Sequence, residues 1–333
     1  MRIPSELRCP AHRLALAADG DALLCARGCR VPVVGDIPRF VRSDGYAEAF
    51  GRQWLTYRRT QLDSETGTPI SRTRLERCLG APLASLRGQS VLEAGCGAGR
   101  FTELLLGAGA RVFACDLSRA VEANLENCGR WPEHFVCQAD ILDLPAADAA
   151  FDLVLCLGVI QHTPDPESTI RALAAKVKDG GRLVIDHYAT PRGAARIAAH
   201  LTPRALLRQA FIRMPSTAAT RAASAITAAM LPLHRVLWRT GGAARAARRV
   251  LRAASPVLDY YDRHPELGPA RLEEWARLDT HDALTDRYKH LRDAGQIRAA
   301  LEWAGLSGIE VAEAGNGIEA RATRSSATAG SQW

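Results

Sequence analysis

Residues 91–101 read VLEAGCGAGRF, an apolar strand end followed by a loop with glycines at positions 95, 97 and 99. A second apolar segment, RVFACD, ends at Asp116, seventeen residues beyond the last of these glycines. Glycine in such a loop lets the backbone approach a ligand closely and adopt a positive φ. An acid at the end of the next strand is placed to accept hydrogen bonds from ribose hydroxyls. Together these features predict a pocket for a nucleoside-bearing cofactor.

Two features of the loop distinguish between nucleoside cofactors. A nicotinamide-binding loop prefers G-x-G-x-x-G, but the spacing here is G-x-G-x-G, and Arg100 occupies the position of the third glycine. Glu93 lies just before the loop, where a carboxylate is unfavourable beside a pyrophosphate and favourable beside an ammonium group. The loop therefore indicates a cofactor that carries an ammonium group rather than a dinucleotide.

The segment resembles motif I of the class I S-adenosylmethionine-dependent methyltransferases, and later segments extend this resemblance in order. QADILDLP (138–145) resembles the stretch after the third strand, FDLVLCLGVIQHTPDP (151–166) the fourth strand and its loop, and VKDGGRLVIDHY (177–188) the turn into the fifth strand. The resemblance covers residues 85–188 and, more weakly, 294–323. It implies an α/β fold with a doubly wound, Rossmann-like sheet of seven strands whose last strand is antiparallel. It also implies S-adenosylmethionine as cofactor.

The resemblance carries over to individual residues. In that family the acid after the third strand, here Asp140, contacts the adenine amino group. The implied cofactor-binding residues are Glu93, Gly95, Cys96, Gly97, Gly99, Asp116, Leu117, Asp140, Ile141 and Leu157.

Three residues at the carboxyl ends of the fourth and fifth strands are candidate bases or substrate contacts. They are His162, His187 and Tyr188, which we expect at the ligand-binding edge of the sheet. For His162 we favour the alternative of a structural hydrogen bond that holds the loop, because the phrase G-V-x-x-H-x-x-D recurs in relatives with unrelated acceptors. His281, in LDTHDAL, is a weaker candidate.

The first forty residues contain two pairs of soft metal ligands. LRCPAH places Cys9 and His12 as one pair, and LLCARGCRVPVVGDIPRF places Cys25 and Cys29 as the other. Four such ligands suit a tetrahedral zinc ion, whose role is structural because no coordination position stays open. The segment resembles the zinc-ribbon-like module that precedes some bacterial methyltransferase domains, with His12 in place of the commoner cysteine. The alternative is a degenerate module that keeps its β-hairpin and has lost its metal.

We expect the chain to divide into five segments. They are a zinc-ribbon-like module (1–42), a helical linker or cap (43–84), the methyltransferase domain (85–189 and 293–323), a helical insertion after the fifth strand (190–292) and a disordered tail (324–333). In the linker, Trp54, Tyr57 and Gln61 share one helix face, and we favour core packing over a cap role for that face. The insertion lies at the edge where open α/β sheets bind ligands, so we expect it to form the lid over the methyl acceptor.

The insertion has an unusual charge pattern. Residues 190–255 contain 12 Arg and no Lys, Asp or Glu, whereas the whole chain carries a net charge of only +7. Arginines three to five residues apart, between Leu, Ile, Val and Trp, are typical of basic amphipathic helices. Three interpretations stay open: a solvated helical lid, an interfacial helix on anionic lipid, and recruitment of an anionic substrate through guanidinium groups. Nucleic acid is disfavoured because no nucleic-acid-binding module accompanies the arginines.

The remaining composition bears on the compartment. No run of about 18 apolar residues occurs, and the N-terminus lacks the apolar core of a signal peptide. We therefore expect a cytoplasmic bacterial protein, with peripheral contact to the inner membrane face as its one membrane alternative. The nine cysteines, such as Cys115 and Cys137, are scattered through apolar segments and are interpreted as reduced core thiols.

Two functions fit these observations. The first is a methyltransferase that transfers a methyl group by in-line displacement to an oxygen or nitrogen on a small molecule, a saccharide or a lipid-linked intermediate. The second is a non-catalytic S-adenosylmethionine-binding or membrane-associated regulatory module of the same fold. We favour the first, because a pocket that no longer binds has no need of three loop glycines and two strand-end acids.

Overall fold

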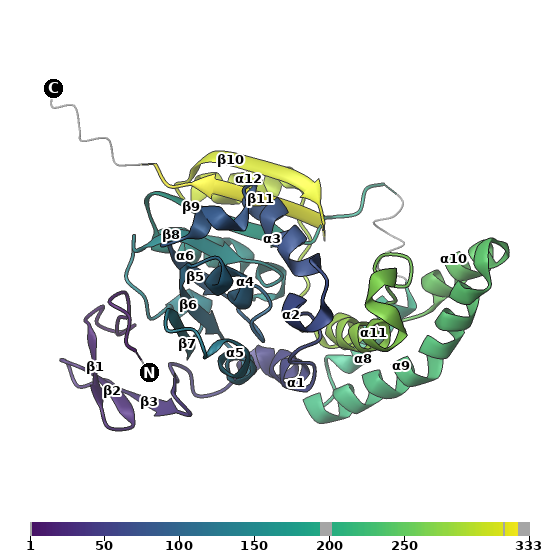
Figure 1. Cartoon of the computed structure of the whole chain (residues 1–333), viewed down its shortest axis with the longest axis horizontal. Helices are drawn as coiled ribbons and strands as arrows, with labels where there is room; N and C mark the ends of the chain where they lie inside the picture. Colours follow the sequence, from purple (N-terminus) through teal and green to yellow (C-terminus); the bar gives the residue numbers. More distant parts are fainter. Residues whose placement is uncertain (1, 194–201, 316, 326–333) are drawn as a thin grey trace. The chain divides into compact units, whose positions relative to one another are not determined.

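The computed structural model describes residues 2–193, 202–315 and 317–325 and divides into two compact units (Figure 1). The first unit is built from the described residues of Met1–Ala47, Pro69–Thr190 and Tyr288–Trp333. The second contains the described residues of Glu48–Thr68 and Pro191–Arg287. The segment 43–84, expected to be one helical linker, is thus divided between the units. Of the tail expected to be disordered (324–333), residues 326–333 lie outside the described residues, as do residues 194–201 of the insertion.

A seven-stranded sheet forms the centre of the first unit. Its strand order is β10-β11-β9-β8-β5-β6-β7, and β11 runs antiparallel to both of its neighbours. The strands are β5 (Ser90–Ala94), β6 (Arg111–Asp116), β7 (His134–Gln138), β8 (Phe151–Cys156), β9 (Val177–His187), β10 (Ser307–Ala314) and β11 (Gly317–Thr323). The crossover from β7 to β8 makes β5 and β8 neighbours and creates the switch point at which such sheets bind ligands. The predicted α/β fold class is confirmed.

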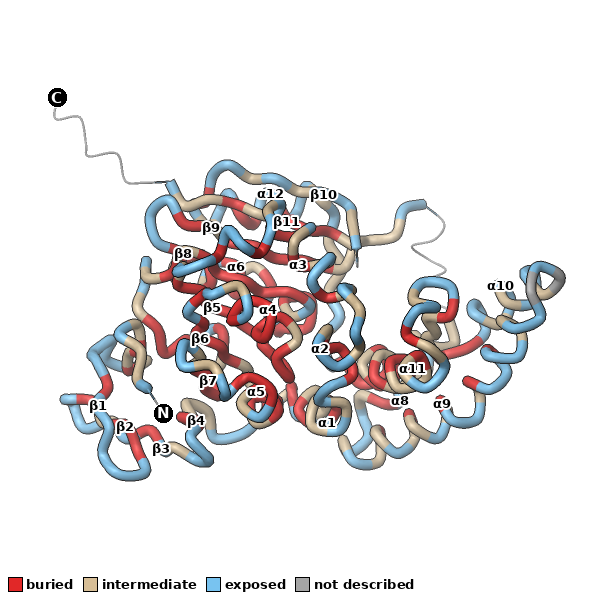
Figure 2. The backbone as a smooth tube through the Cα atoms, in the orientation of Figure 1, coloured by how far each residue is buried: buried red, intermediate tan, exposed pale blue. Residues whose placement is uncertain are grey.

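The two faces of the sheet bury separate sets of apolar side chains, since neighbouring residues of a strand point to opposite faces. Leu92 contributes to one core and Val91 to the other. The first core includes residues of α6 (Pro166–Lys176) and α12 (Ala294–Trp303). The second includes residues of α3 (Ile70–Leu79), α4 (Thr102–Gly107) and α5 (Ala120–Cys128). Figure 2 shows mainly buried residues along the central strands β5, β8 and β9, and exposed residues on α3.

A small antiparallel sheet precedes this fold in the same unit. Its strands are β1 (Leu16–Asp19), β2 (Ala22–Cys25), β3 (Arg30–Val34) and β4 (Ile37–Pro38), paired in sequence order. Leu7 and Leu23 are fully buried in the same core as Leu92, so the N-terminal sheet packs on one face of the large sheet. Short 3-10 turns complete the unit at Gly45–Ala47 (η1), Leu83–Leu86 (η2), Ile141–Asp143 (η3) and Ile160–His162 (η4).

The second unit is helical. It contains α1 (Glu48–Thr56), α2 (Asp63–Thr66), α8 (Pro203–Phe211), α9 (Ser216–Arg239), η5 (Gly241–Ala244), α10 (Arg245–Ala254), η6 (Pro265–Leu267) and α11 (Gly268–Thr285). Phe211, Ala219, Ala223 and Leu284 bring α8, α9 and α11 together in its core. Among the described helices, none is long and apolar enough to cross a membrane.

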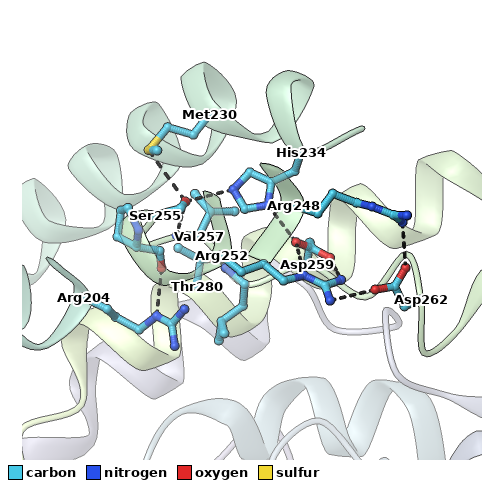
Figure 3. A network of polar contacts seen from close by, with 12 residues as sticks. Arg204, Met230, His234, Arg248, Arg252, Ser255, Val257, Asp259, Asp262 and Thr280 are labelled. Carbon is cyan, nitrogen blue, oxygen red and sulfur yellow. Dashed lines mark hydrogen bonds and ion pairs between the residues drawn. The ribbon is translucent and has the colours of Figure 1, made fainter. Parts of the chain in front are cut away.

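Some arginines of the insertion form ion pairs with acids further along the chain, in residues 259–286. Arg252 binds Asp259 and Asp262, and Arg208 binds Asp286. His234 links this network to α9, because its Nδ1 lies 2.7 Å from Oδ2 of Asp259 and its Nε2 lies 2.9 Å from the hydroxyl of Ser255 (Figure 3). His234, Ser255 and the Asp259 side chain are nearly inaccessible to solvent, so these contacts fasten α9, α10 and the following loop to one another.

Candidate functional site

The glycine loop follows the carboxyl end of β5, and glycine occupies every second position from 95 to 99, each time with a positive φ. The φ angles are 78° at Gly95, 50° at Gly97 and 98° at Gly99, a region that side chains disfavour. A Cβ at Gly95 would lie 2.3 Å from Cγ2 of Val159, in the loop after β8. Glycine is therefore required at position 95 both by the backbone and by the close approach of the β8 loop.

Asp116 ends β6 beside this loop. Its Oδ2 accepts a hydrogen bond from the backbone N–H of Gly97 at 3.0 Å, and its Oδ1 accepts from the N–H and the hydroxyl of Ser118 at 2.8 and 2.7 Å. A carboxylate has about four acceptor positions, so these three bonds leave one on Oδ2. Burial raises the pKa of Asp116, and the three hydrogen bonds oppose that rise. The carboxylate is thus held in place by the loop and can still accept a bond from a ligand hydroxyl.

Asp140 follows β7 and caps the start of η3. Its Oδ1 accepts from the N–H of Leu142 at 2.9 Å, and Oδ2 makes no hydrogen bond to another described residue. The phenol of Tyr46, in η1, is close enough to Asp140 and Asp116 that both carboxylates, after burial, raise its pKa. Tyr46 was not predicted as a site residue, because nothing local in the sequence brings residue 46 to the ends of β6 and β7.

Glu93 is the second-last residue of β5 and is buried, where it begins a series of hydrogen-bonded polar side chains. Its Oε2 accepts from the hydroxyl of Thr102 at 2.6 Å, and that hydroxyl accepts from Nδ2 of Asn124 at 2.9 Å. The Asn124 Oδ1 in turn lies 2.9 Å from Nε2 of His134. Burial raises the pKa of Glu93 to about 8 and lowers the pKa of His134 to about 4, so both side chains are mainly neutral at pH 7.

An ion pair holds the loop after β8. Asp186, near the end of β9, accepts a hydrogen bond from the N–H of Gly158 and pairs with the guanidinium of Arg74 from α3. Arg74 also lies over the ring of Phe101, 5.5 Å from its centroid. Its Nε–H is buried and has no hydrogen-bond acceptor among the described residues. Neither Arg74 nor Asp186 was predicted, since their role depends on α3 packing against β9.

The remaining predicted cofactor residues lie on the same edge. Cys96 is in the glycine loop and is buried, with its backbone N–H bonded to the carbonyl of Cys115 at 3.0 Å. Leu117 follows Asp116 and is half-buried, whereas Ile141, after Asp140, and Leu157, after β8, are buried. The structure thus places all ten predicted cofactor residues at the carboxyl ends of β5, β6, β7 and β8.

The candidate catalytic residues lie at the ends of β8 and β9. His162 is buried, its Nδ1 donates to the carbonyl of Tyr288 at 3.1 Å, and its ring meets that of Tyr188 edge-on at 5.3 Å. His187 is buried and Tyr188 is half-buried. His281 belongs to the other unit, where its ring nitrogens contact the side chains of Gln53 and Thr220 at 2.9 and 3.0 Å.

The N-terminal sheet gathers the four predicted metal ligands. Nδ1 of His12 lies 3.8, 3.6 and 3.4 Å from the sulfurs of Cys9, Cys25 and Cys29. In a tetrahedral site with zinc–sulfur and zinc–nitrogen bonds of about 2.3 and 2.0 Å, neighbouring ligand atoms are about 3.6 Å apart. The turn after β2 has Gly28 at φ 87°, and its Arg27 N–H points to the Cys25 sulfur at 3.4 Å. The donor set and its spacing fit a zinc ion.

Comparisons with known proteins agree with this geometry. Residues 92–185 match a family model described as a methyltransferase domain. A ubiquinone biosynthesis O-methyltransferase of Thiobacillus denitrificans is 37% identical over 103 residues, which are 29% of this chain and 44% of that protein. The enzyme of the same name from Chromobacterium violaceum is 39% identical over 104 residues, again 29% and 44% of the two chains. The chain therefore spans less than half the length of these curated relatives.

Among solved structures, magnesium protoporphyrin IX methyltransferase from Synechocystis PCC 6803 with bound SAH aligns with 85% of this chain and 98% of that chain, at 16% identity and a TM-score of 0.44. The methyltransferase domain is assigned instead from the matched residues, which include most of β5, the glycine loop, Asp116, Asp140 and most of β9. The chain carries a class I S-adenosylmethionine-dependent methyltransferase domain.

Proposed function

We propose that the protein transfers the methyl group of S-adenosylmethionine to an oxygen or nitrogen of a small-molecule acceptor, with saccharides and lipid-linked intermediates included. The observation that carries the proposal is the arrangement around Asp116, where the glycine loop and Ser118 hold a carboxylate that retains a free acceptor position. When bound, the cofactor supplies a methyl group on a sulfonium, which is already a strong electrophile. The protein's contribution is then to bind, align and exclude water.

The described side chains supply complementary groups for each part of that cofactor. Asp116 would accept from the ribose hydroxyls, and Asp140 from the adenine amino group. Glu93 would face the ammonium group, and the buried Nε–H of Arg74 would donate to the carboxylate. A cationic ligand beside Glu93 favours its ionised form, so at pH 7 binding would release a proton from Glu93, whose pKa without ligand is about 8.

The relatives favour oxygen over nitrogen as the atom methylated. Both curated relatives described above are named O-methyltransferases. We therefore propose that the atom methylated by this protein is an oxygen. The insertion, which lies outside the residues 92–185 that match the family model, is proposed as the lid that selects the acceptor.

Titration calorimetry with S-adenosylmethionine tests the cofactor assignment against the non-catalytic alternative. We expect the wild type to bind and Asp116→Ala to bind ten- to a hundredfold more weakly, which is roughly the loss of one hydrogen bond to a charged group. Asp143→Ala is the matched control, because Asp143 is an exposed acid near the same edge. Equal affinities of all three proteins would exclude this pocket. Binding without turnover of any acceptor would favour a regulatory module.

We also propose a structural zinc ion on Cys9, His12, Cys25 and Cys29. The near-equal nitrogen–sulfur separations support it, since three sulfurs gathered around one imidazole nitrogen otherwise have no hydrogen-bonding reason to converge. Four protein ligands leave no position for substrate, so the ion would stabilise the N-terminal sheet and take no part in methyl transfer.

Peripheral contact with an anionic membrane is proposed for one face of α9 and α10. Leu233, Val236 and Val250 expose 50%, 57% and 68% of their surface. Arg239 and Arg249 are exposed close to them in sequence and form no ion pair with another described residue. Exposed apolar side chains with cationic side chains near them in the sequence are typical of interfacial helices. The ion pairs of Arg208 and Arg252 assign other arginines of this segment a structural role.

A further inference from the structure

Three buried polar atoms beside the ends of β8 and β9 have no hydrogen-bond partner among the described residues. They are Oε1 of Gln161, Nε2 of His187 and Nε2 of His290. Gln161 and His187 expose only 2% and 1% of their surface, so bulk water does not compensate these atoms. Leaving a buried polar group unpaired costs about 1–3 kcal/mol, so three in one region call for a missing partner.

Backbone pairing brings these three residues to one place in the first unit. The N–H of His290 donates to the carbonyl of Gln161 at 2.9 Å. Ala189 and Arg292 form a parallel bridge, and extending that register by two residues places His290 beside His187. The ring of His290 also acts on His187, since it is among the groups that lower the pKa of His187.

The hydrogen bonding of His187 determines what its free nitrogen can do. Nδ1 lies 3.0 Å from the carbonyl oxygen of Tyr188, which can only accept, so Nδ1 must carry a hydrogen. Burial lowers the pKa of His187, so the ring is neutral and Nε2 is a bare lone pair. Oε1 of Gln161 is likewise only an acceptor. What the region lacks is therefore a hydrogen-bond donor.

A series of aromatic ring contacts begins at His290. The ring of His290 stacks on Tyr288 at 6.3 Å, and Tyr288 meets Tyr46 edge-on at 5.3 Å. Tyr46 in turn is close to Asp116 and Asp140 of the proposed cofactor pocket. Among the described residues, no group of three metal-binding side chains forms here, since such a group occurs only at Cys9, His12 and Cys29. A hydroxyl group on an aromatic ring would supply the missing donor and could also pack against these rings.

We propose that His187, Gln161 and His290 form the methyl-acceptor site, in which Nε2 of His187 accepts the hydrogen bond of the phenolic hydroxyl that is methylated. This inference rests on the proposed methyltransferase function. As an oxygen lone pair forms the new O–C bond, the C–S bond electrons stay on sulfur, the O–H bond electrons stay on oxygen, and the proton passes to His187. A weak base suffices, because the hydroxyl becomes strongly acidic as its oxygen gains the methyl group.

The test uses phenol and anisole as probes of the full-length protein. Anisole has the same ring but no donor hydrogen, so we expect the wild type to bind phenol about fivefold to tenfold more tightly, the value of one hydrogen bond. His187→Phe should bind both probes equally, and His187→Gln, which keeps an acceptor, should restore part of the preference. Nitrogen-15 NMR of labelled histidines should show that Nε2 of His187 is unprotonated in the free protein. Phenol should shift the resonance of this nitrogen, and anisole should not.

Separate outcomes distinguish this inference from the proposed function. Loss of S-adenosylmethionine binding by the wild type overturns the function, whereas the histidine variants should keep that binding within about twofold, since His187 is not among the proposed cofactor contacts. Equal affinities of the wild type for phenol and anisole, no binding of either probe, or a hydrogen on Nε2 of His187 in the free protein overturns the acceptor site. The charged and ionisable groups that act on the pKa of His187 are Arg292, Asp186 and His290.

Discussion

Replacing Glu93 with glutamine should remove a pH-dependent loss of stability. The pKa of Glu93 rises from 4.5 to about 8 on folding because burial disfavours its charge. Between these values the unfolded chain has released the proton and the folded chain retains it, so stability falls as pH rises from about 4.5 to about 8 and is level above. At 1.36 kcal/mol per pKa unit, the whole change approaches about 5 kcal/mol, and local relaxation reduces it to a few kcal/mol.

Glutamine is the informative substitution, because it is neutral at every pH and keeps an oxygen to accept the hydrogen bond from Thr102. Urea unfolding of the wild type and Glu93→Gln without cofactor, at intervals from pH 5 to pH 9, measures the difference directly. We expect the variant to gain 2–5 kcal/mol relative to the wild type over this range, an estimate on the order of the linkage energy above. Glu302→Gln, which removes an exposed carboxyl on α12, is the control for charge effects elsewhere.

Parallel pH profiles of the wild type and Glu93→Gln would refute the reasoning, because they would mean that Glu93 titrates alike in the folded and unfolded chains. A second measurement concerns ligand binding. Calorimetry in buffers of different ionisation enthalpy should detect up to one proton released per cofactor bound at pH 7, and no such release in Glu93→Gln.

Three further predictions concern other parts of the molecule. Gly95→Ala should lose about 2–4 kcal/mol of stability by urea unfolding and fail to bind the cofactor, because its Cβ would lie 2.3 Å from Val159, whereas Gly88→Ala, with φ 74° and nothing within 4 Å, should lose only the backbone cost of about 1–2 kcal/mol. Elemental analysis should find one zinc per chain in the wild type and in Cys78→Ser, and none in Cys25→Ser; equal metal content in all three would contradict the site. In sedimentation with phosphatidylglycerol vesicles, the affinity of the double variant Arg239→Glu and Arg249→Glu should fall at least tenfold, because each arginine near the surface contributes about 1 kcal/mol of binding free energy. The affinity of the control Arg263→Glu should not fall. Equal binding of the wild type to neutral phosphatidylcholine vesicles would argue against an electrostatic surface.

Much of the sheet followed from local sequence patterns. The sequence predicts a helix over 295–306 and strands over 309–314 and 318–323, and the structure has α12 at Ala294–Trp303, β10 at Ser307–Ala314 and β11 at Gly317–Thr323. These elements were predictable because apolar periodicity and the Asp293 cap, whose side chain accepts from the N–H of Gln296, act over a few residues.

The charge pattern of the insertion shows where local reasoning stops. A segment with 12 arginines and no acid within residues 190–255 predicts solvated or ligand-binding guanidinium groups. The structure instead pairs Arg208 with Asp286, and Arg252 with Asp259 and Asp262, which lie up to 78 residues away from their partners. Only the packing of α8, α10 and the following loops determines which arginines are satisfied.

The sequence by itself determined the glycine loop and the strand-end acids Asp116 and Asp140, because glycine φ preferences and strand periodicity are properties of neighbouring residues. The order of the strands was implied by the resemblance to the methyltransferase family. Tertiary structure alone brought Tyr46 to those acids and left His187 and Gln161 buried without donors. These features arise from contacts between segments that are distant in the chain. The cofactor half of the site could thus be predicted from local motifs, whereas the proposed acceptor half depends on which distant segments fold beside β8 and β9.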